Sequence, residues 1–179
     1  MAQDEKLTFE SEYEPSPSET IYYRPPTLED LDEIYALESC SYPEDEAATL
    51  EKLKLRIEEA PNVFLLALQG EKIAGFTCGT CSTAPELTHA SMSQHEPDGQ
   101  LLCVHSVVIA EGLRRKGCAT KMLQAYIRYV QATTPHLQEI RLLSKDNLVK
   151  LYVGVGFVLW GTSSVCHGSE QWMELQYTF

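Results

Sequence analysis

The chain has 179 residues, 44% of them hydrophobic, and a formal net charge of −12 from 26 acidic and 14 basic side chains. This composition excludes collagen-like and generally disordered chains, and the acidity argues against nucleic acid as a partner, because a polyanion would be repelled. No apolar run approaches the ~20 residues needed to cross a bilayer, so we expect no membrane partner. A small cationic substrate suits this charge better.

Residues 1–19 are acidic, contain prolines and show no periodicity, which predicts a flexible acidic tail. The tail lacks the basic and apolar regions of a signal peptide, so we expect a cytoplasmic protein whose single domain covers residues 20–179. Disulfides are rare in that compartment, and the six cysteines are expected to be free thiols. Cys78 and Cys81 form one Cys-x-x-Cys pair with no second ligand pair after it, so no metal site is predicted.

Helices are predicted where apolar residues recur every three or four positions. The first follows the cap residue Thr27 and places Leu31 and Ile34 on one face, and the second is stopped by Pro61. A longer helix follows the basic turn around Gly117. The predicted helices cover residues 27–39, 47–60, 119–130 and 146–155.

Strands are predicted for short apolar runs that are bounded by turn residues. Gly70 and Glu71 separate two such runs and indicate a hairpin. The run "LLCVHSVVI" at 101–109 is too uniformly apolar to be exposed on either face, which is typical of a central strand. This mixed order of strands and helices predicts an α/β fold with a mixed sheet. The predicted strands cover residues 21–24, 62–69, 72–79, 101–109, 139–143, 158–165 and 170–177.

The stretch "RRKGCATKM" places three basic residues and Gly117 between the central strand and the long helix. A helix N-terminus offers unpaired N–H groups and the positive end of the helix dipole, and a glycine lets an anion approach the backbone closely. A basic island in an acidic protein therefore indicates a pyrophosphate site. The motif alone leaves open a second interpretation, in which a solvated basic loop uses Gly117 only to turn.

The spacing Arg114-x-x-Gly117-x-Ala119 resembles the acetyl-CoA signature of the GNAT superfamily, and here it follows a strand and opens a helix. The segments "ASMSQHEPDGQLLCVHSVVIAEGLRRKGCA" and "LVKLYVGVGF" are similar to corresponding segments of the serotonin N-acetyltransferase (arylalkylamine N-acetyltransferase) family. The resemblance runs from about Ile21 to the C-terminal "GSEQWMELQYTF". It implies a single-domain α/β fold of the GNAT type, with a mixed, mostly antiparallel central sheet flanked by helices.

The resemblance also implies catalytic residues. His105 matches a strand histidine that takes a proton from the amine, whereas Cys103 stands where the family has its other strand histidine. Cys103 and His105, two residues apart on a strand, should share one face. Tyr152 matches the tyrosine near the coenzyme sulfur that protonates the departing thiolate. Without the family, His105 would be interpreted as a core histidine bonded to a carbonyl and Tyr152 as a core aromatic residue.

The same resemblance implies acetyl-CoA as co-substrate, with no metal and no covalent acyl-enzyme. Backbone groups of Val107, Val108 and Ile109 would hold the acetyl carbonyl and the pantetheine arm. Cys118 is interpreted as a small residue of the turn, not as a nucleophile, because no base stands beside it in the sequence. The residues implied in coenzyme binding at the turn are Arg114, Arg115, Lys116, Gly117, Cys118, Ala119 and Thr120.

Tyr42 and Pro43 match a family loop that closes over the amine substrate. The acidic residues 44–46 that follow have two possible roles. They either form a solvated connection whose charges favour the start of the next helix, or face the pocket and allow it to bind a polyamine.

The expected function is acetyl transfer from acetyl-CoA to a small primary arylalkylamine such as tryptamine, serotonin or phenethylamine. The reaction needs a base, because an alkylamine with a pKa near ~10 is protonated at neutral pH and cannot attack a thioester. A histidine with an ordinary pKa of ~6.5 suits that task. Two alternatives remain open: acetyl transfer to a polyamine or a protein amine, and an acyl-CoA-binding protein without turnover. We expect a monomer.

Overall fold

The computed structural model describes residues 20–88, 90–91, 93–163 and 171–179, so the predicted tail and Cys166 lie outside the described residues. Within them, seven strands form one sheet and four α-helices surround it. The strands are β1 (Ile21–Arg24), β2 (Phe64–Gln69), β3 (Lys72–Ser82), β4 (Leu101–Ile109), β5 (Glu139–Ser144), β6 (Val158–Thr162) and β7 (Met173–Thr178). The helices are α1 (Leu31–Ser41), α2 (Leu50–Glu59), α3 (Cys118–Thr133) and α4 (Val149–Val153).

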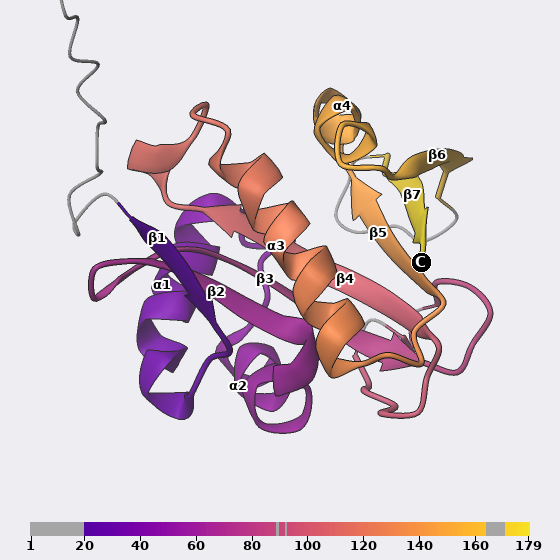
Figure 1. The fold of residues 1–179 in the computed structure, drawn as a ribbon, viewed down its shortest axis with the longest axis horizontal. Helices are drawn as coiled ribbons and strands as arrows, with labels where there is room; N and C mark the ends of the chain where they lie inside the picture. Colours follow the sequence, from indigo (N-terminus) through magenta and orange to yellow (C-terminus); the bar gives the residue numbers. More distant parts are fainter. Residues whose placement is uncertain (1–19, 89, 92, 164–170) are drawn as a thin grey trace, which may run out of the picture.

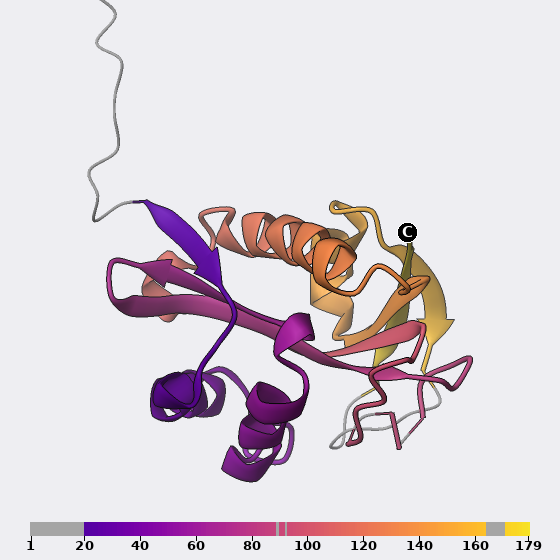
Figure 2. The same ribbon diagram turned by 60° about the horizontal axis from the view of Figure 1, so that its bottom comes forward.

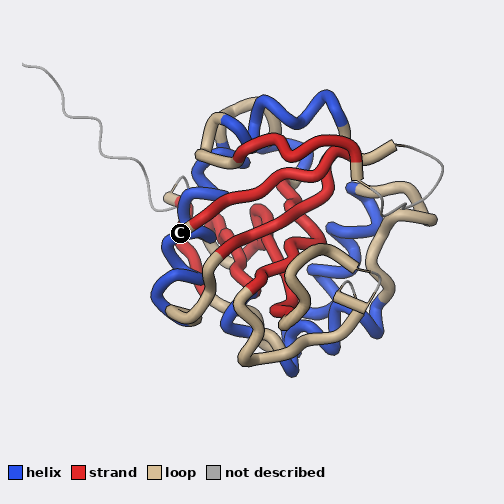
Figure 3. The backbone as a smooth tube through the Cα atoms, turned by 90° about the vertical axis from the view of Figure 1, so that its right-hand side faces the viewer, coloured by secondary structure: helices blue, strands red, loops and turns tan. Residues whose placement is uncertain are grey.

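The elements stack in three layers, with α3 on one face of the sheet and α1 and α2 on the other (Figures 1 and 2). The strand order is β1-β2-β3-β4-β5-β7-β6, and all neighbours are antiparallel except the central pair β4 and β5, which is parallel. Figure 3 shows the strands at the centre of the molecule and the helices around them. The predicted α/β fold with a mixed, mostly antiparallel sheet is confirmed. No described helix has the length and apolar composition of a membrane span.

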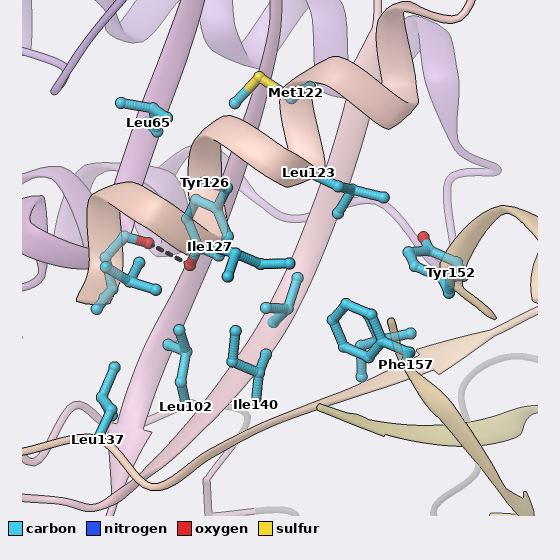
Figure 4. Packing of buried hydrophobic residues seen from close by; sticks show 14 of the residues in the cluster. Leu65, Leu102, Met122, Leu123, Tyr126, Ile127, Leu137, Ile140, Tyr152 and Phe157 are labelled. Carbon is cyan, nitrogen blue, oxygen red and sulfur yellow. Dashed lines mark hydrogen bonds between the residues drawn. The ribbon is translucent and has the colours of Figure 1, made fainter. Parts of the chain in front are cut away.

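Helix α3 forms because its apolar residues recur on one face, and that face is buried on the sheet. Met122, Leu123 and Tyr126 pack there with apolar residues of β2, β4 and β5 (Figure 4). The Tyr126 hydroxyl, buried in this layer, donates a hydrogen bond of 2.7 Å to the carbonyl of Val63. Each fully buried side chain of this size stabilises the fold by roughly 1.5–3 kcal/mol relative to exposure.

The predicted N-terminus of the second helix, at residue 47, is wrong by three residues. Helix α2 begins at Leu50, because the side chain of Thr49 caps it by accepting a hydrogen bond from Lys52 N–H. Residues 43–47 instead turn back on Pro43, whose carbonyl accepts hydrogen bonds from the N–H groups of Glu46 and Ala47. This turn lengthens the loop between α1 and α2, and that loop forms one wall of the candidate site.

Strands β4 and β5 pair only from Leu101↔Glu139 to Val104↔Leu142, although both continue further. Beyond that point they diverge, β4 toward the start of α3 and β5 toward α4 (Figure 1). The divergence therefore opens the sheet at its centre. There the facing edges of β4 and β5 no longer pair with each other.

On its other edge, β4 pairs with β3 over its whole length, with one irregularity. Cys78 pairs with Ser106 and Gly79 with Val104, so His105 is an extra residue on β4, that is, a β-bulge. Gly79 permits this close approach, because a Cβ there would lie only 2.6 Å from the carbonyl oxygen of Cys103. The bulge thus lies beside the point where β4 and β5 separate.

Candidate active site

A cavity of about 340 Å³ lies where β4 and β5 diverge, a volume that suits a small ligand. Residues 104–107 of β4 form one side, and residues 142–145 at the end of β5 form the other. The remaining walls come from α1, the loop at 42–48, α2, Tyr152 of α4 and Trp172. The opening in the sheet is therefore lined by polar and titratable side chains and by strand backbone that no neighbouring strand pairs.

The bulge changes which face of the sheet the side chains of β4 point to. Before it, Leu102 and Val104 face the core under α3, and after it Val107 packs against that same core. A regular strand would put Val104 and Val107 on opposite faces, so the extra residue shifts the alternation. His105 and Ser106 consequently both point to the opposite face.

His105 is held by a hydrogen-bond chain. Its Nε2 lies 2.7 Å from Thr80 Oγ1, and the Thr80 hydroxyl lies 2.7 Å from the carbonyl oxygen of Ser91. A carbonyl oxygen only accepts, so Thr80 must donate its hydrogen to Ser91 and accept one from His105. Neutral His105 therefore carries its proton on Nε2 and its basic lone pair on Nδ1.

Cys103 shares the face of His105, since it lies opposite Thr80 across the β3–β4 ladder. It is 0% exposed, packs with Leu87 and Leu143, and does not line the cavity. Burial raises the pKa of its thiol to about 11, so the thiol stays neutral near pH 7. The structure brings His105, but not Cys103, into the cavity.

Tyr152 lines the cavity from α4 and is 6% exposed. Its ring packs edge-on against Phe157, with the ring centroids 5.8 Å apart. Burial raises the pKa of Tyr152 to about 12. The phenol is therefore a neutral hydrogen-bond donor over the whole range around pH 7.

Tyr42 and Pro43 line the cavity from the loop after α1. The Tyr42 hydroxyl lies 3.2 Å from both backbone groups of Val107, accepting from the N–H and donating to the carbonyl. Its pKa is raised, first by burial and then by the neighbouring Tyr152. Both phenols thus line the cavity, Tyr42 directly at the edge of β4.

The three strand residues expected to hold the coenzyme differ in where their backbones point. Val107 directs its N–H and carbonyl away from β3, toward Tyr42, and the Ile109 carbonyl accepts a hydrogen bond of 2.9 Å from Arg114 Nε. Because backbone groups alternate along a strand, those of Val108 point toward β3. Val107 therefore offers backbone groups at the opening, whereas those of Val108 point to β3 and the Ile109 carbonyl is bonded to Arg114.

The turn before α3 is exposed at residues 114–117 and partly exposed at 118–120. Gly117 is its left-handed N-cap residue, with φ +77°, and a Cβ there would meet no atom within 4 Å. Arg115 also has a positive φ, 62°. The first helical bond runs from Lys121 N–H to the Gly117 carbonyl, so the N–H groups of Cys118, Ala119 and Thr120 have no acceptor within the helix.

The basic side chains of this turn are not all directed outward. Arg114 folds back, with Nη2 3.1 Å from the Ser41 hydroxyl of α1, and Lys116 Nζ donates to the Gly112 carbonyl at 2.8 Å. Arg114 therefore joins the ends of α1 and β4. The anion-binding capacity of the turn lies in its open backbone, in the exposed Arg115 and in the remaining donors of Lys116.

The acidic loop faces the cavity in part. Asp45 and Glu46 line it, whereas Glu44 does not. Glu46 Oε1 forms an ion pair of 2.9 Å with Lys145 Nζ, and that ammonium lies 5.3 Å from the centre of the Trp172 ring. The interpretation of the loop as a purely solvated connection therefore does not hold for Asp45 and Glu46.

Sequence reasoning missed several residues of the site: Glu38, Thr80, Ser106, Lys145 and Trp172. Glu38 had a usable signal, because it follows Ile34 by four positions and so falls on the buried stripe of α1. A charged residue in such a stripe indicates a specific buried partner. Among the described residues, no group of three His, Cys, Asp or Glu side chains is arranged to hold a metal ion.

Comparison with known proteins identifies what this arrangement is similar to. The profile described as "Acetyltransferase (GNAT) family" matches residues 31–157. Serotonin N-acetyltransferase of Mesocricetus auratus is 25% identical over 127 residues, which cover 71% of this chain and 61% of that relative. The chain thus spans less than two thirds of that protein's length.

Two solved structures share the fold at low sequence identity. The loading GNATL domain of CurA from Lyngbya majuscula has a TM-score of 0.78 at 15% identity, covering 89% of this chain and 98% of that one. The GphF GNAT-like decarboxylase in complex with isobutyryl-CoA has a TM-score of 0.77 at 16% identity, covering 88% of this chain and 98% of that one. At these identities the likeness concerns the fold.

Proposed function

Because the chain belongs to the acetyltransferase (GNAT) family, we propose that it transfers an acetyl group from acetyl-CoA to a small primary arylalkylamine. One observation carries the proposal: His105, at the bulge in β4, lines a cavity that Tyr152 also lines, at the place where β4 and β5 separate. A proton acceptor, a proton donor and unpaired strand backbone then surround one space. Direct acyl transfer needs these three elements and no covalent intermediate.

The residues at the strand end and the turn fit acetyl-CoA. The N–H of Val107 is available to the acetyl carbonyl oxygen once the Tyr42 hydroxyl releases it, and would stabilise the charge that develops there. The open turn at Gly117, where a Cβ would meet nothing, suits a diphosphate. A protein of the same fold was solved with isobutyryl-CoA, which supports an acyl-CoA as a ligand of this chain.

We assign proton acceptance to His105 and stabilisation of the leaving thiolate to Tyr152. The lone pair on His105 Nδ1 accepts a proton from the ammonium, directly or through water, and the freed amine attacks the thioester carbon. As the C–S bond breaks, the coenzyme leaves as a thiolate, and the nitrogen gives its second proton to that sulfur, so the products are the neutral amide and CoA–SH. With a pKa of about 12, Tyr152 stabilises that thiolate by a hydrogen bond; complete transfer to a thiol of pKa ~8.5 would be uphill by about 5 kcal/mol.

The acceptor is proposed from the cavity walls and from the relatives. Tyr42 and Trp172 give the cavity aromatic walls, which suit an aryl group on a short amine chain. The curated relatives are serotonin N-acetyltransferases, and their names support an arylalkylamine. The proposal thus includes an arylalkylamine as the physiological substrate. It also includes a monomer as the oligomeric state.

A polyamine is the second candidate, because Asp45 and Glu46 line the cavity. Their effect is reduced by the ion pair between Glu46 and Lys145, which places a positive charge at the same rim. We therefore rank a polyamine below an arylalkylamine.

The test is thiol release from acetyl-CoA by the purified protein with a panel of tryptamine, phenethylamine, serotonin and spermine. We expect kcat/KM for the arylalkylamines to exceed that for spermine. A large preference for spermine would replace the first candidate by the second. Tight binding of acetyl-CoA without thiol release for any amine would instead identify a coenzyme-binding protein without turnover.

A further inference from the structure

Glu38 of α1 is a carboxylate buried at the cavity and not used by the chemistry above. It is 1% exposed and lines the cavity. Its Oε1 accepts hydrogen bonds from Ala48 N–H at 2.8 Å and from the Ser106 hydroxyl at 3.1 Å. Its Oε2 is buried and has no hydrogen-bond partner among the described residues. One oxygen is thus fixed by the protein and the other is left for a ligand.

An unpartnered carboxylate oxygen in this position needs an explanation, because burying it without a hydrogen bond is costly. Arg56 of α2 also lines the cavity and its charge favours the ionised form of Glu38, against the burial that raises the pKa of that carboxyl. Yet no ion pair within 4 Å joins these two described residues, and Arg56 Nη1 lies 3.7 Å from Cys78 Sγ. The charge of Arg56 therefore stabilises the carboxylate of Glu38 without an ion pair, and Oε2 of Glu38 has no hydrogen bond to a described residue.

The location of Glu38 connects it with the proposed base. Its hydrogen-bond partner Ser106 is the neighbour of His105, and because of the bulge both point toward the same face, that of α1. A group bound at Glu38 Oε2 would therefore lie on the same side of the sheet as His105. Ala48, the other partner, belongs to the loop that forms the cavity wall.

We propose that Glu38 is the residue that recognises the ammonium group of the substrate, with Oε2 accepting a hydrogen bond from R–NH3+. This inference rests on the proposed amine acetylation and adds the group that selects the protonated amine and holds it near His105. A charge-assisted hydrogen bond to a desolvated ammonium is short and strong, and an ammonium has three donors and no acceptor, matching an acceptor-only oxygen.

Two features of the cavity argue against other sites for the ammonium group. Glu46 also has a buried Oε2 without a partner, but its Oε1 is paired with Lys145, so a cation is already present there. The charged residues in the lining comprise three acidic and three basic side chains, so net charge does not favour a cation. Selection therefore depends on the unbonded oxygen of Glu38.

Glu38→Gln tests the assignment, because the amide retains an oxygen for Ala48 and Ser106 while the charge is lost. We expect kcat/KM for phenethylamine to fall about 10- to 100-fold, mostly through KM, as loss of one charged hydrogen bond implies. For O-benzylhydroxylamine, which is neutral at pH 7, the fall should be below about threefold. The Kd for acetyl-CoA should not change.

Two control variants separate charge from structure. Ser106→Ala removes one bond to Oε1 but keeps the carboxylate, and it should affect the charged and the neutral substrate alike. Glu38→Asp keeps the charge and should retain the preference for the charged substrate, which keeps the test valid if Glu38→Gln does not fold. Circular dichroism and thermal unfolding establish the fold of each variant.

Direct binding of phenethylammonium to the protein with CoA, measured by calorimetry, separates this inference from the proposed function. If the wild-type protein transfers no acetyl group but binds the amine about tenfold more tightly than Glu38→Gln, the ammonium site stands and the acetyltransferase proposal fails. If acetyl transfer is found and the ratio between charged and neutral substrate is the same in both proteins, the inference about Glu38 is overturned. Absence of amine binding to the wild-type protein would also overturn it.

Discussion

Removing a single oxygen atom, in Tyr42→Phe, tests whether the coenzyme competes with Tyr42 for the edge of β4. In the structure, the Tyr42 hydroxyl occupies both the N–H and the carbonyl of Val107. If the acetyl group is to use that N–H, the phenol must release it. The coenzyme and the Tyr42 hydroxyl are then alternatives, and the free energy of the two hydrogen bonds opposes coenzyme binding.

The magnitude follows from the two hydrogen bonds. Both are 3.2 Å long, at the weak end of the usual range, and each contributes a net ~0.5–1.5 kcal/mol, or about 1–3 kcal/mol together. The ligand-free Tyr42→Phe variant should lose this free energy of unfolding, which lowers Tm by about 2 to 12 °C for a chain of this size. Since the variant has no such bonds to break, its Kd for acetyl-CoA should fall by about 5- to 150-fold.

The assay pairs thermal unfolding without ligand with calorimetry of acetyl-CoA binding. Tyr35→Phe is the matched control, because Tyr35 lies on α1, the helix that ends just before Tyr42, and is 40% exposed and outside the cavity lining. Neither quantity should change in that variant. A lower Tm without tighter coenzyme binding in Tyr42→Phe would mean that Tyr42 keeps its bonds to Val107 in the complex. The proposed role of the Val107 N–H would then be wrong.

Substitutions at three further positions test other parts of the site. His105→Gln should lower kcat about 10²- to 10⁴-fold and move activity to higher pH, where the amine is already free, with the Kd for acetyl-CoA unchanged; unchanged kinetics would remove His105 from the mechanism. Thr80→Val should lower kcat about tenfold by releasing His105 Nε2, and Thr80→Ser should restore it; equal activity of the two would contradict the assigned tautomer. Gly117→Val should raise the KM for acetyl-CoA about tenfold through backbone strain at φ +77°, and an unchanged KM would show that the turn is wrongly assigned.

The elements that could be predicted are those whose pattern is set by burial. The apolar face of α3 and the uniformly apolar β4 were readable because each is packed against a continuous core. The start of α2 was missed because polar contacts fix it. Thr49 caps the helix, while Ala48 is held by Glu38 from α1, a contact that no local pattern contains.

The site could be predicted where a motif or one residue carries it, as with the turn at Gly117 and with His105. The roles of Thr80 and Ser106 could not be predicted, because the partners of these two side chains depend on the register between β3 and β4. Cys103 illustrates the opposite case: its position in the strand suggested a role, and only the packing around it shows that it does not reach the cavity. Sequence order identifies neighbours along the strand but not which wall each one faces.

The extra residue at the bulge explains why the side chains of Ser106 and Val107 do not point where regular strand alternation would place them. Without it, Ser106 would point toward α3 and could not bond Glu38, and Val107 would leave that core. With it, three successive residues supply a base, an anchor for a buried carboxylate and an N–H that no neighbouring strand uses and that donates to Tyr42 instead. Because the pairing with β5 ends at Val104, this N–H faces the cavity instead of another strand. The bulge and the end of the parallel pair must therefore coincide for the site to exist, and they do so within two residues.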